Sequence, residues 1–130
     1  MLHIKTVMGV MLAAAITLIA GCYKNKTVFF ETGNEITRTV SFNNDIIPIF
    51  NSSCNISGCH SSGGKAPDLS EVNAFTSLTN GNFINTNSPT ESELYLWMTG
   101  KRGTPMPVNG INRDYNSLIL AWLKQGATNN

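Results

Sequence analysis

Residues 54–60, Cys54-Asn55-Ile56-Ser57-Gly58-Cys59-His60, decide how the chain is expected to fold. Two thiols followed at once by an imidazole suit a covalently attached c-type haem, which needs one thiol for each of two vinyl groups and a histidine under the iron. Four residues separate the cysteines, whereas the usual number is two. The longer loop must bulge, and Gly58 can take the positive φ that a bulge needs. Two cysteines of an exported protein also commonly form a disulfide, so the loop alone leaves that alternative open.

The first 21 residues have the pattern of a secretory signal. A weakly basic start with Lys5 leads into an apolar run from Val7 to Ala20, which is short for a membrane span. The run ends at Ile19-Ala20-Gly21-Cys22, which resembles the lipobox of bacterial lipoproteins. That resemblance implies that the signal, residues 1–21, is cut before Cys22 and that Cys22 carries the lipid. The alternatives are that Cys22 is simply a third cysteine of a secreted protein, or that the signal remains as an uncleaved anchor.

Removal of residues 1–21 limits the chemistry of the mature chain. The formal net charge falls from +1 to about zero with the loss of Lys5, so no basic surface argues for nucleic acid. His60 is then the sole histidine. Zinc lacks an obvious fourth ligand beside Cys54, Cys59 and His60, and no nucleophile elbow suggests a serine hydrolase.

A second iron ligand opposite His60 must therefore come from another side chain, and a thioether is the common remaining choice. Met106 stands between Pro105 and Pro107, which stiffen its loop. Met98 is the less favoured substitute, because it continues a helical apolar pattern and is expected to pack in the core.

Periodicity predicts an all-α domain over residues 41–130, preceded by a lipid-anchored tether over residues 22–40. Asn43 or Asn44 is expected to cap a short first helix, and a second is expected over 70–78. Ser88 and Glu91 form a capping box for a third helix, which is expected to run to Met98 and end at Gly100. The last helix is the most strongly periodic and is expected to end at Gly126. The end of the tether alternates apolar and polar residues, which suggests an extended strand along the domain.

The stretch from about Ser41 to the C-terminus resembles the monohaem cytochrome c domains of bacterial lipoproteins, near the planctomycete-type family. The matching residues are Ser41-Phe42, Asp45 to Phe50, Gly58-Cys59-His60, Gly63-Gly64, Ala66 to Ser70, Leu94-Tyr95, Met98-Thr99-Gly100, Met106-Pro107, Trp122-Leu123 and Gln125-Gly126-Ala127. The resemblance implies a class I-like helical fold around one haem, with the first and last helices packed across each other. It implies that Cys54 and Cys59 attach the haem, that His60 is the proximal ligand and that Met106 is the distal one. The four-residue cysteine spacing departs from the usual pattern, which bears on which maturation system attaches the haem.

These inferences together predict a single-electron carrier rather than an enzyme, because six-coordinate iron leaves no position for a substrate. Redox proteins would be its transient partners, the protein would be a monomer, and Lys65, Lys101 and Arg102 are candidates for the haem edge. Tyr23 after the lipidated cysteine is not an acidic retention signal, which favours the outer membrane, facing the periplasm. The expected haem envelope is aromatic, drawn from Phe50, Phe75, Tyr95, Trp97 and Trp122.

Two rival functions stay open at this point. One is a haem-free surface lipoprotein that is stabilised by a Cys54–Cys59 disulfide and acts as a binding module. The other keeps the haem but makes Met106 labile, which gives a five-coordinate site for gas sensing or for reaction with peroxide.

Overall fold

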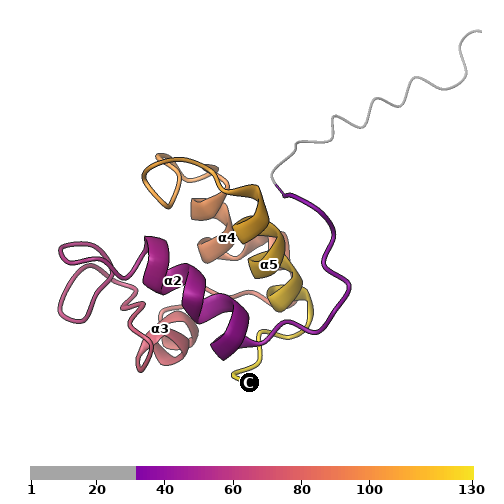
Figure 1. The fold of residues 1–130 in the computed structure, drawn as a ribbon, viewed down its shortest axis with the longest axis horizontal. Helices are drawn as coiled ribbons and strands as arrows, with labels where there is room; N and C mark the ends of the chain where they lie inside the picture. Colours follow the sequence, from indigo (N-terminus) through magenta and orange to yellow (C-terminus); the bar gives the residue numbers. More distant parts are fainter. Residues whose placement is uncertain (1–31) are drawn as a thin grey trace, which may run out of the picture.

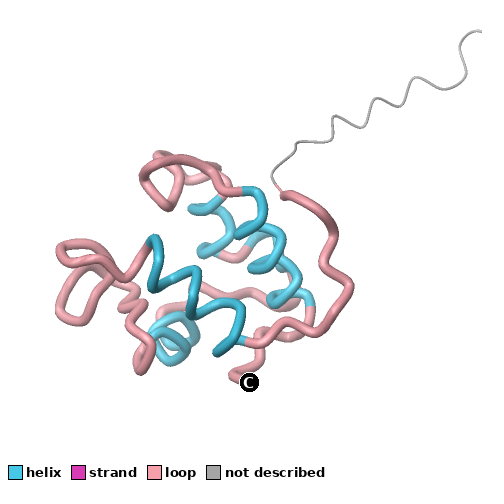
Figure 2. Tube along the Cα trace, in the orientation of Figure 1, coloured by secondary structure: helices cyan, strands magenta, loops and turns pink. Residues whose placement is uncertain are grey.

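The computed structural model describes residues 32–130, and within this range the chain is helical without β-strands (Figures 1 and 2). This agrees with the predicted all-α class. The predicted signal, Cys22 and the first part of the predicted tether lie outside these residues. No helix in the described range combines the length and apolar character needed to cross a membrane. The elements in chain order are η1 (Phe42–Ile46), α2 (Ile47–Ser53), α3 (Ala74–Asn80), η2 (Pro89–Glu91), α4 (Glu93–Met98) and α5 (Arg113–Lys124).

The first helical unit is capped by Ser41, two or three residues earlier than the sequence suggests. Ser41 Oγ accepts a hydrogen bond from Asn44 N at 3.2 Å, so Ser41 is the cap and the predicted caps, Asn43 and Asn44, are wrong. A π-helical turn, η1, then continues directly into α2. Asp45 fixes this start, because its carboxylate accepts from Ser41 N and from the Arg38 guanidinium. These hydrogen bonds, with that from Arg38 first, lower the pKa of Asp45.

The second predicted helix is confirmed as α3, which begins at Ala74 rather than at Ser70. Its end is more specific than a plain glycine stop. Asn82 takes a left-handed conformation at φ +58°, and Phe83 N donates to Leu78 O at 3.0 Å. This left-handed helix end gives the last carbonyl groups of α3 hydrogen-bond partners and directs the Phe83 side chain back towards the domain.

The third predicted helix is interrupted, and its predicted capping box is wrong. Ser88 makes no capping hydrogen bond, and η2 ends after Glu91. Ser92 is extended (φ −62°, ψ 131°) and fully buried, and its hydroxyl joins Asn85 N at 2.8 Å and Asn85 O at 3.2 Å. This tertiary contact replaces the local cap, and α4 starts only after Ser92. The predicted end at Gly100 is confirmed by a φ of +75° there.

The helix α5 supplies the centre of the core. Asn112 caps it by accepting from Asp114 N and Tyr115 N, and Gly126 ends it at φ +94°. Its fully buried Trp122 packs on Phe42 of η1, with ring centroids 5.1 Å apart. Phe42 in turn meets Phe75 of α3 edge to face at 5.4 Å. The first and last helical units are therefore joined through Phe42 and Trp122.

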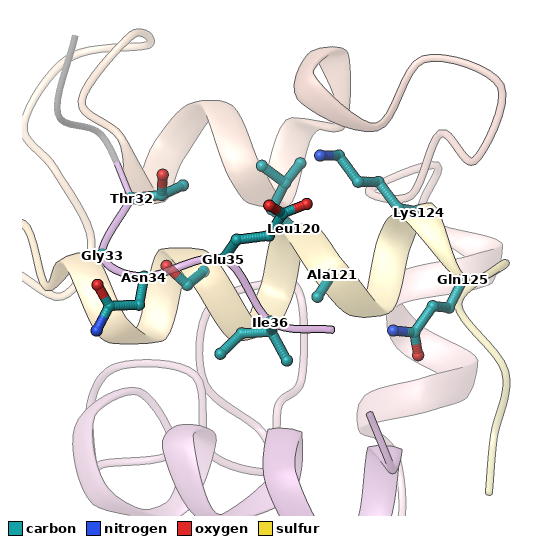
Figure 3. Close-up of a pocket in the computed structure, with 10 residues that line it drawn as sticks. Thr32, Gly33, Asn34, Glu35, Ile36, Leu120, Ala121, Lys124 and Gln125 are labelled. Atoms are coloured by element: carbon teal, nitrogen blue, oxygen red, sulfur yellow. The ribbon is translucent and has the colours of Figure 1, made fainter. Parts of the chain in front are cut away.

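Residues 32–40, here called the N-terminal strap, lie along α5 (Figure 3). Gly33 N donates to Arg113 O at 2.8 Å at one end of the helix. At the other end the Gln125 side chain accepts from Val40 N at 2.8 Å and donates to Arg38 O at 3.0 Å. Val40 is only 1 % exposed. This part of the predicted tether thus packs on the domain, without pairing as a strand.

Replacement of Gln125 by Ala is expected to lower the free energy of unfolding by about 1–2 kcal/mol, because it removes both hydrogen bonds to the strap and leaves the Val40 amide without its acceptor. Urea denaturation of the chain followed by circular dichroism measures this. The matched control is Lys124→Ala, at an exposed neighbour, for which we expect a change within about 0.5 kcal/mol. Equal effects of the two substitutions would show that the Gln125 contacts with the strap add nothing to stability.

Candidate functional site

The loop after α2 folds back on itself and brings His60 beside Cys54. Cys54 O accepts from Ile56 N at 2.9 Å and from His60 N at 3.2 Å, and Cys59 N donates to Ile56 O at 2.8 Å. Gly58 sits at φ +81°, so the positive φ expected there is confirmed. The four residues between the cysteines therefore form a closed bulge. Cys54 and His60 stay close together despite the longer spacing.

The His60 ring is oriented by backbone carbonyls. Its Nδ1 lies 3.1 Å from Lys65 O and 3.0 Å from Pro67 O. A carbonyl oxygen only accepts, so Nδ1 must carry the proton, which assigns the tautomer and leaves the lone pair on Nε2. A histidine held in this way has one nitrogen fixed and the other ready to bind a metal.

The segment that supplies these carbonyls is itself tied down. Lys65 N donates to Cys59 O and Leu69 N to His60 O, both at 2.7 Å. Asp68 accepts from Ser70 N at 2.9 Å and from Asn73 Nδ2 at 2.9 Å, and hydrogen bonds from Ser70 and Asn73 lower the pKa of Asp68. The position of the Pro67 carbonyl is thus set by a network rather than by a free loop.

Gly64 lets this segment pass close to the cysteine loop. A Cβ built on Gly64 would lie 2.4 Å from Cys59 O and 2.9 Å from Ser61 O. Real Cβ atoms do not approach a backbone oxygen so closely, so only glycine fits between these two carbonyls without a shift of the chain.

His60 opens onto an apolar cavity of about 390 Å³, within the range of about 300–1,000 Å³ that small-molecule and cofactor sites occupy. Three loops and two helices contribute to its wall, and most of the side chains there are hydrocarbon or aromatic. The lining residues are Phe50, Cys54, His60, Lys65, Ala66, Pro67, Leu69, Phe83, Leu94, Trp97, Met98 and Met106.

Both candidate methionines line this cavity. Met106 is half-buried on the loop between α4 and α5, and its amide donates to Trp97 O at 3.0 Å, which fixes the loop against α4. Met98 lies on α4 itself and is 3 % exposed. The cavity thus offers an imidazole nitrogen and a thioether from two segments far apart in the sequence.

The two thiols differ in their surroundings. Cys54 is half-buried and lines the cavity, whereas Cys59 is exposed and does not, and the two are not joined by a disulfide. Burial, and secondarily the charge of Cys59, raises the pKa of Cys54 to about 11.

The expected aromatic envelope is realised only in part. Phe50 and Trp97 line the cavity, whereas Phe75, Tyr95 and Trp122 belong to the core elsewhere. Sequence reasoning missed Leu69, Phe83 and Leu94. Among the basic candidates, Lys65 lies at the cavity, whereas Arg102 pairs with Glu93. In residues 32–130 no group of three or more His, Cys, Asp or Glu side chains is placed to hold a metal ion.

Comparison of the chain with protein-family models, with curated proteins and with solved structures finds no match.

In the haem-free chain, Cys59 is expected to react with iodoacetamide before Cys54. With a pKa of about 11, Cys54 is about one part in a thousand thiolate at pH 8, and only the thiolate attacks. Its rate should therefore rise about tenfold for each pH unit up to about pH 11. Peptide mass spectrometry of timed, quenched samples gives both rates. Faster labelling of Cys54 at pH 8 would contradict its placement in the cavity wall.

Proposed function

We propose that this chain is an exported, lipid-anchored monohaem c-type cytochrome that carries one electron at a time. The observation that carries the proposal is the apolar cavity onto which His60, Cys54 and Met106 converge. Cys54 and Cys59 would attach the haem, His60 would be the proximal iron ligand and Met106 the distal one, with Met98 as the less favoured substitute. Cys22, after a cleaved signal of residues 1–21, would carry the lipid.

The donor set fits a haem c. The hydrogen bonds of His60 Nδ1 to Pro67 O and Lys65 O leave Nε2 as the ligating atom. Met106 supplies a neutral sulfur at the same cavity, and Cys54 supplies a thiol at its wall. Cys59 is exposed and outside the cavity wall, but it is adjacent to His60 in the chain, so attachment through Cys59 and ligation by His60 would involve the same porphyrin.

A bound haem c supplies reversible one-electron chemistry at its iron. The chain's own residues would set the reduction potential of the iron. Hydrogen bonding of Nδ1 fixes the orientation of the His60 ring. A thioether ligand favours the reduced state over a second nitrogen ligand. The walls formed by Leu69, Phe83 and Leu94 exclude water and disfavour the additional charge of the oxidised state, which acts in the same direction.

If His60 and Met106 both hold the iron, they would leave no position for a substrate, so the proposed role is electron transfer without catalysis. Partners would be other redox proteins of the cell envelope, met over a small, transient interface by a monomer. The proposed location is the outer membrane, on the periplasmic side.

The decisive experiment is expression of the full chain in a host competent for c-type maturation. We expect a pyridine haemochrome spectrum, colour that survives acid-acetone extraction, and a mass increase of one haem. His60→Ala should lose the low-spin spectrum. A colourless protein whose only sulfur linkage is Cys54–Cys59 would overturn the proposal in favour of a haem-free binding module.

Met106→Ala and Met98→Ala form a matched pair that tests the distal ligand. Both residues line the cavity, but only Met106 is on the proline-flanked loop. We expect Met106→Ala to lose the charge-transfer band between methionine sulfur and ferric iron, and Met98→Ala to keep it. Loss in Met98→Ala alone would make Met98 the ligand. Absence of the band in the unsubstituted protein, with ready binding of carbon monoxide, would indicate a five-coordinate site.

A further inference from the structure

The wall of the apolar cavity has a single permanently charged side chain. Among the twelve residues that line it, Lys65 is the only lysine or arginine, and none is an aspartate or a glutamate. The remaining side chains offer hydrocarbon, aromatic rings, sulfur or the His60 imidazole. A carboxylate placed against such a wall without a partner is costly, because it loses its hydration and gains nothing in return. A ligand of this cavity that carries a carboxylate must therefore bring it to Lys65 or out into water.

Lys65 stands where the cavity opens to solvent. Of the lining residues, only Lys65, Ala66 and Trp97 are exposed, whereas the others are buried or half-buried. The opening is therefore bordered by residues 65–66, just before the buried Pro67, and by Trp97 of α4.

The border at Trp97 offers no cation of its own. Glu93, one turn before Trp97 on α4, forms an ion pair with Arg102, so these two charges offset each other. Neither Arg102 nor Lys101 is among the lining residues. The attraction of this cavity for an anionic group is therefore concentrated at Lys65.

The backbone of Lys65 is fixed against the cysteine loop through both of its polar groups. Its amide donates to Cys59 O at 2.7 Å, and its carbonyl oxygen lies 3.1 Å from His60 Nδ1, from which it accepts. The side chain of Lys65 thus starts from a point that is tied to the residue proposed to bind the iron. Only the flexible part of the side chain beyond its Cα remains to be ordered by a bound group.

The ammonium group of Lys65 has no ion pair within the described part of the chain. The acids that follow it most closely are Asp68 and Glu71. The Asp68 carboxylate is engaged elsewhere, because it accepts from Ser70 N and from Asn73 Nδ2, each at 2.9 Å. Glu71 is exposed and does not line the cavity. The cation at the opening is therefore available to a carboxylate from outside the chain.

We propose that Lys65 binds a carboxylate of the haem and holds that edge of the porphyrin at the opening of the cavity. Haem carries its carboxylates together on one edge of an otherwise apolar ring, which matches an apolar wall with one cation at its border. A hydrogen bond between an ammonium group and a carboxylate is charge-assisted and therefore stronger than a neutral one. The inference deepens the proposed function and rests on it, because it assigns a residue to the cofactor proposed for this cavity.

This pairing gives Lys65 a second effect, on the redox state of the iron. A carboxylate near the iron favours the ferric state, which has one more positive charge, and the Lys65 ammonium group offsets this attraction. The pairing itself requires contact, whereas the effect on the iron requires only proximity. The two therefore need separate measurements.

The contact is tested in the haem-loaded, unsubstituted chain with a water-soluble carbodiimide. This reagent joins an amine to a carboxylate with which it is already paired: an amide bond forms, and the carbodiimide takes up the water that is lost. We expect an amide between Lys65 Nζ and the haem. Peptide mass spectrometry would show it as the loss of one water from the haem peptide and as failure of trypsin to cut after Lys65. An amide of Lys65 with Asp68 or Glu71 instead, or no amide at Lys65, overturns the inference.

The charge is tested with Lys65→Gln and its matched control Lys124→Gln, each held in the same redox buffer. Lys124 is also an exposed lysine, but it lies at the end of α5 and is not among the lining residues. We expect Lys65→Gln to lower the ratio of ferrous to ferric haem about threefold or more, and Lys124→Gln to change it by less than about 1.5-fold. Lys65→Arg keeps the charge and should keep the ratio. Equal changes in the Lys65→Gln and Lys124→Gln variants overturn the inference.

Failure of this inference is distinguishable from failure of the proposed function, because the absorption spectrum of the same samples reports the haem and its ligands. A coloured, low-spin protein without the Lys65 amide refutes only the role of Lys65. A chain that binds no haem refutes the proposed function itself.

Discussion

The site depends on one interaction, the pairing of His60 Nδ1 with the carbonyls of Pro67 and Lys65. It decides which nitrogen carries the proton, and it ties the cysteine loop to the segment that follows. Neither partner is a side chain, so the arrangement relies on the path of the backbone. That path is secured from both sides, by the amide of Leu69 on His60 O and by the close passage that Gly64 permits. The orientation of the imidazole is therefore set jointly by the cysteine loop and the segment that follows it, and not by His60 alone.

The second constraint is that the core does not close around this imidazole. The rings of Phe75 and Trp122 both pack on Phe42, whereas the side chains beyond Phe50 leave a hollow of about 390 Å³. The apolar wall of this cavity is not covered by other side chains of the described residues, and apolar surface that is exposed to water costs free energy. A small domain also has little apolar area to spare. A flat apolar group bound here would bury this apolar wall, so the proposed cofactor would also stabilise the fold.

The sequence was most informative where a local signal had no competitor. The periodicity of α5, the end of α4 at Gly100 and the positive φ at Gly58 were all predictable, because each depends on a few neighbouring residues. The break at Ser92 was not, since its hydroxyl is engaged by Asn85 in a contact that outweighs the capping signal at Ser88. The lining residue Phe83 was missed for a similar reason: its direction follows from a left-handed asparagine, and no pattern of spacing reveals that. Convergence of His60 and Met106 was expected from the ligands that a haem iron needs and from the family resemblance, because no local rule brings such distant segments together.

The N-terminal strap has a mechanical consequence. It is held by Gly33 at the start of α5, and near its other end by Gln125 and by the ion pair of Arg38 with Asp45, and the chain before Thr32 joins it on the Gly33 side. A force applied through that chain acts first on the hydrogen bond of Gly33 and only afterwards on the contacts near Gln125. Release of residues 32–37 breaks the hydrogen bond of Gly33, whereas release of residues 38–40 also breaks the contacts of Gln125 and Asp45 and exposes the buried Val40. The distance between the domain and a point of attachment on the preceding chain therefore depends on how much of the strap has separated from α5.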